Sequence, residues 1–212
     1  MKISRLTLFW ITALLVSSPA AFSAEPYAAE FSPAWRTRLA FLTKPQTVTA
    51  AFSESRTTPL KKRPVVVTGT VRIDRARGLS LTYNQKKSPV IILDDRGLLL
   101  RQPDGREQSA PPEAETDLRL LHALFAFDLA TLEKSYALAA TDSPEGTWTL
   151  TFTRRPDDPA TYRELALTGD ATRLTTITLG KSASNKTVIT VEPPRLDVPF
   201  TPDELARYFR KP

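Results

Sequence analysis

The sequence contains no cysteine, which excludes disulfide bonds, thiolate metal ligands and thiol nucleophiles. The same absence leaves no site at which a lipid could be attached through a cysteine sulfur. A chain of 212 residues can be stable on its hydrophobic core alone. We therefore expect a protein that folds without disulfides and is not itself a lipoprotein.

Residues typical of catalytic sites are scarce. The single histidine, His122, lies in the apolar segment "LRLLHALFAF", where neither a partner base nor a second metal ligand is evident. The seven glycines are scattered, and neither a phosphate-binding loop nor a G-x-S-x-G nucleophile elbow is present. We expect no catalytic residue, no metal site and no cofactor.

Two acidic pairs leave a minor alternative open. Asp94-Asp95 and Asp157-Asp158 lie beside Gly or Pro, where Asp typically caps the backbone of a turn. A calcium site or an acid–base role at these pairs remains the other interpretation. A hydrolase assembled from distant carboxylates is a further alternative, which nothing in the sequence supports.

Long apolar runs are confined to the beginning of the chain. Lys2 and Arg5 precede the apolar run 6–16, and small residues follow up to Ala24. This order is typical of a Sec-type signal peptide, and the run is shorter than the ~20 residues of a membrane span. We predict a signal peptide at 1–23 and one domain at 24–212 that is soluble in the periplasm and does not span the membrane.

The sequence has no long segment in which charged residues of one sign predominate. The 29 Lys and Arg are mixed with 23 Asp and Glu, without the basic stripe and interleaved aromatics of a nucleic-acid-binding protein. The tight cluster Lys61-Lys62-Arg63 is interpreted as a solvated loop, or as a contact with an anionic membrane surface or partner. We expect no nucleic-acid partner.

Segments in which apolar residues alternate with other residues, as in half-buried strands, are abundant. In "GTVRIDRARGLSLTY" (69–83), Val71 and Ile73 and then Leu79, Leu81 and Tyr83 alternate with other residues around a short turn. Similar patterns elsewhere predict about ten mostly antiparallel strands. At ~4.8 Å per strand such a sheet would be about 48 Å wide if flat, so it is expected to curl.

Helix signals mark the start, middle and end of the domain. Ser32 and Pro33 open one helix, 116–127 has a helical apolar stripe, Asp128 can cap a short helix after it, and Thr201 begins a capping box. We predict an α+β, mainly β fold. It is an incomplete, half-open antiparallel β-barrel with helices across its open side as a lid over a hydrophobic cavity.

Three motifs follow one another in the first half of the domain, "VTAAFSES", "GTVRIDRARGLSLTY" and "VIILDDRGLLLRQPDGREQ". Their order resembles the pattern of the LolA family of periplasmic lipoprotein carriers. The matching positions are Phe52, Gly69, Arg75, Leu79, Tyr83, Asp95 and Gly97. The sequence departs from the pattern at Glu54, where Gln is usual, at Ala76, where Pro is usual, at Leu81, where Trp is usual, and at an inserted Arg96.

The resemblance implies an unclosed barrel that binds acyl chains and has no enzymatic activity. It implies a monomer that accepts an acylated lipoprotein or other lipid from an inner-membrane exporter and delivers it to an outer-membrane acceptor. In that family the basic residue corresponding to Arg75 binds backbone carbonyls of the lid helix, which makes Arg75 the expected lid latch.

The residues expected to line the cavity come from the strands and from the lid. They are Val71, Ile73, Leu79, Leu81, Tyr83, Leu99, Leu121, Leu124, Phe125, Trp148, Leu150 and Phe152. The alternative for each of them is ordinary core packing.

Two further functions stay open. The second half resembles a divergent LolA-related branch associated with aryl-polyene or similar lipid export. The fold could also serve as a periplasmic protein-binding or sensor module with its cavity filled by side chains.

Overall fold

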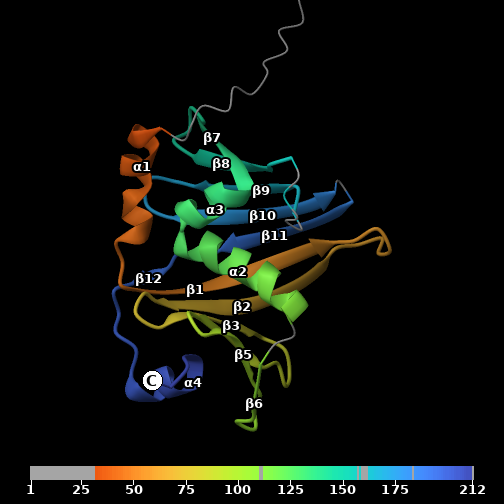
Figure 1. The fold of residues 1–212 in the computed structure, drawn as a ribbon, viewed down its shortest axis with the longest axis vertical. Coiled ribbons are helices and arrows are strands. Elements are labelled where there is room, and N and C mark those ends of the chain that lie inside the picture. Colours follow the sequence, from red (N-terminus) through yellow and green to blue (C-terminus); the bar gives the residue numbers. More distant parts are fainter. Residues whose placement is uncertain (1–31, 110–111, 157, 159–161, 183, 212) are drawn as a thin grey trace, which may run out of the picture.

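One antiparallel sheet of 12 strands forms the body of the molecule (Figure 1). The computed structural model describes residues 32–109, 112–156, 158, 162–182 and 184–211. The predicted signal peptide, residues 1–23, and Asp157 therefore lie outside the described residues. The strands are β1 (Thr47–Thr57), β2 (Val65–Asp74), β3 (Gly78–Tyr83), β4 (Val90–Asp94), β5 (Gly97–Arg101), β6 (Glu107–Ser109), β7 (Tyr136–Asp142), β8 (Trp148–Arg154), β9 (Glu164–Gly169), β10 (Leu174–Ser182), β11 (Asn185–Val191) and β12 (Arg195–Leu196).

The sheet is unclosed, which confirms the predicted incomplete barrel. Its strand order is β6-β5-β4-β3-β2-β1-β11-β10-β9-β8-β7, and β12 pairs with β1 outside this path. The long strand β1 therefore lies in the middle, between β2 and β11.

The β2–β3 hairpin has the register that the alternating pattern indicates. Val71 pairs with Leu81 and Ile73 with Leu79, and all four side chains are buried. Gly78 ends the turn with φ +103°, and a Cβ there would lie 2.3 Å from the carbonyl oxygen of Leu93. Only glycine fits this turn without strain.

Two short strands were not predicted. β6 lies in the polar stretch after Pro103, and β12 has two residues and follows Pro193-Pro194. Strands of two or three residues are too short to show a period of two, so neither produced a signal in the sequence.

Three of the α-helices begin at the predicted caps, whereas the middle one begins at Pro112, ahead of the predicted range 116–127. The helices are α1 (Pro33–Leu39), followed by the 3-10 helix η1 (Ala40–Thr43), α2 (Pro112–Ala126), α3 (Leu129–Ser135) and α4 (Pro202–Tyr208). Ser32 and Asp128 each accept a hydrogen bond from a backbone N–H of the helix that they precede. Thr201 and Glu204 form the complete capping box of α4.

The helices do not all lie on one face of the sheet. In Figure 1, α2 and α3 cross in front of the strands, whereas α4 lies beyond β3 and β5. Arg101 donates hydrogen bonds to the carbonyl oxygens of Ala206 (2.7 Å) and Phe209 (3.1 Å). The guanidinium of Arg72, which alternates with inward-facing Val71, lies 3.7 Å from the ring centroid of Tyr208. The C-terminal helix therefore packs on the outer face and is not part of the lid, contrary to our expectation.

Candidate functional site: an apolar cavity under a latched helix

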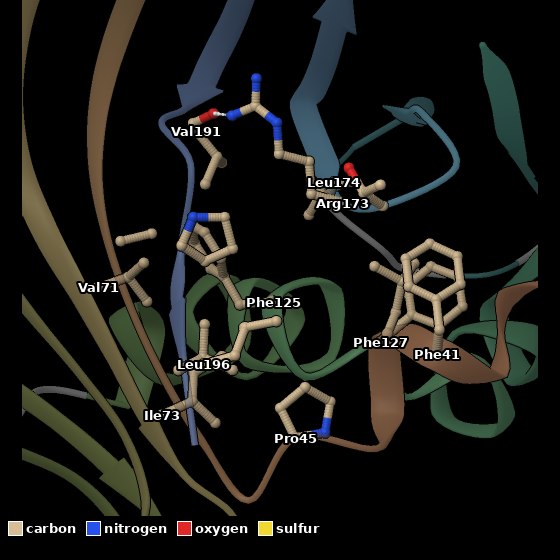
Figure 2. A pocket seen from close by; sticks show the side chains of 15 residues that line it. Phe41, Pro45, Val71, Ile73, Phe125, Phe127, Arg173, Leu174, Val191 and Leu196 are labelled. Carbon is tan, nitrogen blue, oxygen red and sulfur yellow. Dashed lines mark hydrogen bonds between the residues drawn. The ribbon is translucent and has the colours of Figure 1, made fainter. Parts of the chain in front are cut away.

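A cavity of about 80 Å³ lies between the inner face of the sheet and the C-terminal end of α2 (Figure 2). It is lined almost entirely by apolar side chains, with Thr172 and Arg173 as the polar exceptions. The apolar lining residues are Phe41, Leu42, Pro45, Val48, Ala50, Val71, Ile73, Phe125, Phe127, Leu174, Val191, Pro194 and Leu196. Such a lining suits hydrocarbon and offers little to a polar ligand.

The sheet side of the cavity follows from strand register. Val48 pairs with Ile73 and Ala50 with Val71, so these side chains project from the same face of neighbouring strands. Ala50 has a single methyl group, and the small side chain leaves space above the sheet.

The lid side consists of Phe125 and Phe127. Helix α2 ends in a Schellman motif, because the N–H of Asp128 donates to the carbonyl of Ala123 (2.8 Å) and the N–H of Phe127 to that of Leu124 (3.3 Å). Phe127 occupies the left-handed position with φ +57°, where glycine is usual. Its ring packs edge-on against Trp148 at a centroid separation of 6.3 Å. This unusual conformation turns the Phe127 ring back into the cavity.

Arg75 joins the lid to the sheet. Its guanidinium donates hydrogen bonds to the carbonyl oxygens of Pro45 (2.9 Å), Leu42 (3.1 Å) and Ala126 (3.4 Å). Ala126 is the last residue of α2, where a cation is also favoured by the helix dipole. Arg75 therefore contacts the end of the lid helix and the η1–β1 segment at once, in the arrangement that the resemblance implies for a latch.

His122 lies beside this contact, on α2. Burial lowers its pKa, the charges of Arg119 and Arg75 lower it further, and Asp128 acts in the opposite direction. Burial therefore favours the neutral form of the imidazole beside the Arg75 contacts. Among the described residues, no group of three or more His, Cys, Asp or Glu is placed to hold a metal ion.

Most of the residues expected to line the cavity pack into one core. Of them, Val71, Ile73 and Phe125 line the cavity itself. The others that belong to the core or pack against it are Leu79, Leu81, Tyr83, Leu121, Leu124, Trp148, Leu150 and Phe152.

Leu99 is not among them. Leu99 pairs with Ile92 and lies two residues before Arg101 on β5, so the side chains of Leu99 and Arg101 project from the same face. Arg101 donates a hydrogen bond to Phe209 at the end of α4, so this face is the one that α4 covers. Leu99 therefore lies on the outer face of the sheet, away from the cavity.

Glu54, which stands where the family pattern usually has Gln, makes a buried polar contact away from the β2–β3 turn. Glu54 is 6% exposed and accepts a hydrogen bond of 2.9 Å from the hydroxyl of Tyr83. Phe52 packs edge-on against Tyr83, and a Cβ on Gly69 would lie 2.5 Å from the Phe52 ring. The Phe52 and Gly69 of the family pattern are thus one packing unit.

Several lining residues were missed by sequence reasoning. Phe41 and Leu42 come from η1, Phe127 from the helix end, and Pro194 and Leu196 from the segment around β12. All lie in turns or short elements, where periodicity gives no information on the side that a residue faces.

No helix in the described part of the chain has the length and apolarity needed to cross a membrane. Comparison with curated protein sequences gives no match.

Distant structural similarity is found to several solved proteins. A LolA superfamily protein from Nitrosomonas europaea is 13% identical, with a TM-score of 0.44 over 82% of this chain and 95% of its own. A domain named as an outer membrane lipoprotein-sorting protein, from Vibrio parahaemolyticus, is 9% identical, with a TM-score of 0.44 over 80% and 93%. LprF from Mycobacterium bovis is 13% identical, with a TM-score of 0.36 over 80% and 96%.

Comparison of the sequence with models of protein families identifies the family. Residues 34–184, more than half of the chain, match the model of the family described as outer membrane lipoprotein carrier protein LolA-like. The chain therefore belongs to the LolA-like family of outer membrane lipoprotein carriers.

Proposed function

We propose that this protein is a soluble periplasmic carrier that binds acyl chains of lipoproteins or of another lipid and moves them from the inner to the outer membrane. The observation that carries this proposal is the apolar cavity directly beneath a lid helix whose end is hydrogen-bonded to Arg75. An inner-membrane exporter and an outer-membrane acceptor are the partners that such a route requires. It needs no catalytic residue or cofactor, and the carrier acts as a monomer.

The size of the cavity supports a lid that moves. A space of about 80 Å³ holds a few water molecules or a few methylene groups, but not a whole acyl chain. A longer chain enters only if α2 moves away from the sheet. Each CH₂ buried contributes ~0.8 kcal/mol, so a few of them give several kcal/mol of binding.

The Arg75 contacts supply the opposing force that release needs. Opening breaks the hydrogen bond from the charged Arg75 side chain to the carbonyl of Ala126 on α2, while the bonds to Leu42 and Pro45 hold the guanidinium in place. Such bonds contribute about 1.5–3 kcal/mol each when buried, and less here because Arg75 is only partly buried and water can replace them. Closure over the empty cavity therefore competes with cargo, and binding stays reversible.

Native mass spectrometry of the mature protein purified from its own periplasm, followed by lipid extraction, tests this function. We expect a bound acylated species that a fluorescent hydrophobic probe displaces. A clean apo mass together with no binding of the probe would contradict the carrier function.

A protein-binding or sensor function is the second candidate. The observation that favours it is that most of the expected cavity residues are fully packed, such as Leu150 and Phe152 at 0% exposure. In that case the protein binds no hydrophobic probe but is recovered with a specific protein partner after crosslinking in the periplasm.

A further inference from the structure

A second, polar cleft adjoins the latch. It has a volume of about 950 Å³ and lies between the β2–β3 turn, the β4–β5 turn, the lid helix α2 and the start of α3. Arg75 lines this cleft, while Leu42 and Pro45, whose carbonyls it binds, line the apolar cavity. The latch residue therefore lies between the two spaces.

Arginines dominate the walls of this cleft, which we call the arginine cleft. Its charged residues are Arg75, Arg77, Arg96, Arg119, Arg210, Asp94, Asp95 and Asp128, and His122 and Thr131 also line it. Three aspartates thus face five arginines, so the cleft carries excess positive charge.

Ion pairs reduce this excess without removing it. Asp94 is shared by Arg210 at 2.8 Å and Arg96 at 3.6 Å, and Arg77 is paired at 2.8 Å with Asp74, which lies outside the lining. With Asp74 counted, five arginines face four carboxylates, and one positive charge remains in excess. Arg75 donates to neutral carbonyl oxygens, and the only influence on its pKa among the described residues is burial, which lowers it. At His122, whose pKa is lowered mainly by burial, the charge of Asp128 raises the pKa while the charges of Arg119 and Arg75 lower it, so charges of both signs act on this imidazole.

We propose that the arginine cleft binds a phosphate-type anion, the chemical group present in the head group of an anionic phospholipid. Guanidinium groups match phosphate oxygens in pairs, and the hydroxyl of Thr131 adds a neutral donor. The cleft is larger than one phosphate and has room for the rest of a head group. The lipid source rests on the proposed carrier function, but binding of phosphate itself does not.

Binding at this cleft also acts on the lid. An anion that attracts the Arg75 guanidinium competes with the carbonyl oxygens of Ala126 and Leu42. The lid end is then released while the head group is held next to it. The head group of a lipid would in this way open the cavity for its own acyl chain.

Titration calorimetry of the delipidated full mature chain at low ionic strength tests this proposal. The probes are sodium phosphate and short-chain phosphatidylglycerol, with sodium chloride and a neutral short-chain diacylglycerol as references. We expect phosphate and phosphatidylglycerol to bind and sodium chloride to give no heat of binding. The diacylglycerol, which has acyl chains but no phosphate, should bind more weakly than phosphatidylglycerol, and its binding should not change in Arg119→Gln.

Two substitutions that each remove one positive charge locate the site. Arg119→Gln alters the wall of the cleft, and Arg63→Gln alters the loop between β1 and β2, which projects from the other end of the sheet (Figure 1). Because Arg119→Gln removes one charge-assisted contact, we expect it to weaken the binding of phosphate and of phosphatidylglycerol about tenfold. Arg63→Gln leaves both affinities unchanged.

The outcomes separate the cleft from the carrier function. Tighter binding of phosphatidylglycerol than of phosphate, both sensitive to Arg119→Gln, supports a head-group site. Equal binding of the two supports the cleft but overturns its lipid source. Absence of phosphate binding, or equal losses in both variants, overturns the cleft even if the hydrophobic probe binds. Phosphate binding without probe binding refutes the carrier function alone.

Discussion

In the proposed carrier mechanism, closure of the lid depends on Arg75. Arg75→Leu removes three hydrogen bonds from the lid end and from the η1–β1 segment. We expect the closed empty state to weaken, so that cargo is held longer and handed over less. A lipid-transfer assay between donor and acceptor vesicles measures this.

The matched control for the latch is Arg106→Leu. Arg106 lies in the exposed turn before β6, where its side chain is 83% exposed, and this substitution should leave transfer unchanged. If Arg75→Leu also transferred cargo at the rate of the unmodified protein, Arg75 would be an ordinary surface arginine.

His122 makes the stability of the protein depend on pH. Its pKa in the folded state is lowered from 6.5, by burial first and then by Arg119 and Arg75, against the opposite effect of Asp128. The unfolded chain therefore binds the proton first, and the stabilisation present above pH 6.5 is lost as the pH falls through the folded-state pKa.

Urea unfolding of the wild type and of His122→Gln, at about pH 7.5 and pH 5, measures this contribution. We expect the free energy of unfolding of the wild type to fall more on acidification than that of the variant. Parallel losses in the two proteins would show that His122 has no part in the pH dependence.

At the scale of the element, the end of α2 holds Phe127 in a conformation that suits glycine. A non-glycine residue at positive φ costs about 1–2 kcal/mol. Both Phe127→Ala and Phe127→Gly lose the contact of the ring with Trp148, but only the alanine retains the strain. We expect both variants to be less stable than the wild type, with Phe127→Gly about 1 kcal/mol more stable than Phe127→Ala.

Denaturant unfolding of the two variants checks this order. In the interior of a helix alanine is favoured over glycine, so the reverse order is specific to the left-handed position. Greater stability of the alanine variant would show that the helix continues through residue 127.

Strand alternation predicted which residues share a face, but not which face is the inside. Val71, Ile73, Leu79 and Leu81 were expected to line the cavity. All four share one face of paired strands and lie in the core, but of these four only Val71 and Ile73 also line the cavity. Leu99 was assigned to the same side from its apolar character, yet it is covered from the outside by α4. On β5 the residues Leu98, Leu99 and Leu100 are all apolar, so the sequence offers no alternation from which to choose.

At the scale of the whole molecule, the small side chain of Ala50 leaves space between the sheet and the lid. Ala50→Leu should fill part of the space above Val71 and weaken binding of a fluorescent hydrophobic probe about tenfold. The same substitution at Ala139, on β7 and outside the cavity, is the control and should leave binding unchanged.

Fluorescence titration gives the affinities, and thermal unfolding shows whether each variant folds. Extra methylene groups in a packed region cost about 1–3 kcal/mol, so a modest loss of stability is expected for Ala50→Leu. Unchanged affinity in a folded Ala50→Leu protein would place the probe elsewhere.

The sequence by itself determined the local structure and the class of the fold. Period-two alternation defined the long strands, Ser32, Asp128 and Thr201 defined three helix starts, and the order of short motifs indicated the LolA-like family. These signals are local, because capping and alternation depend on residues a few positions apart.

Only the tertiary structure decided where the cavity lies and what surrounds it. Arg75 meets the carbonyl of Ala126 across 51 positions of sequence, and the arginine cleft collects side chains from segments between Arg75 and Arg210. The packing of α4 on the outer face also required the complete sheet. Such contacts depend on how elements pack in three dimensions, and no periodicity in one sequence encodes the distance between them.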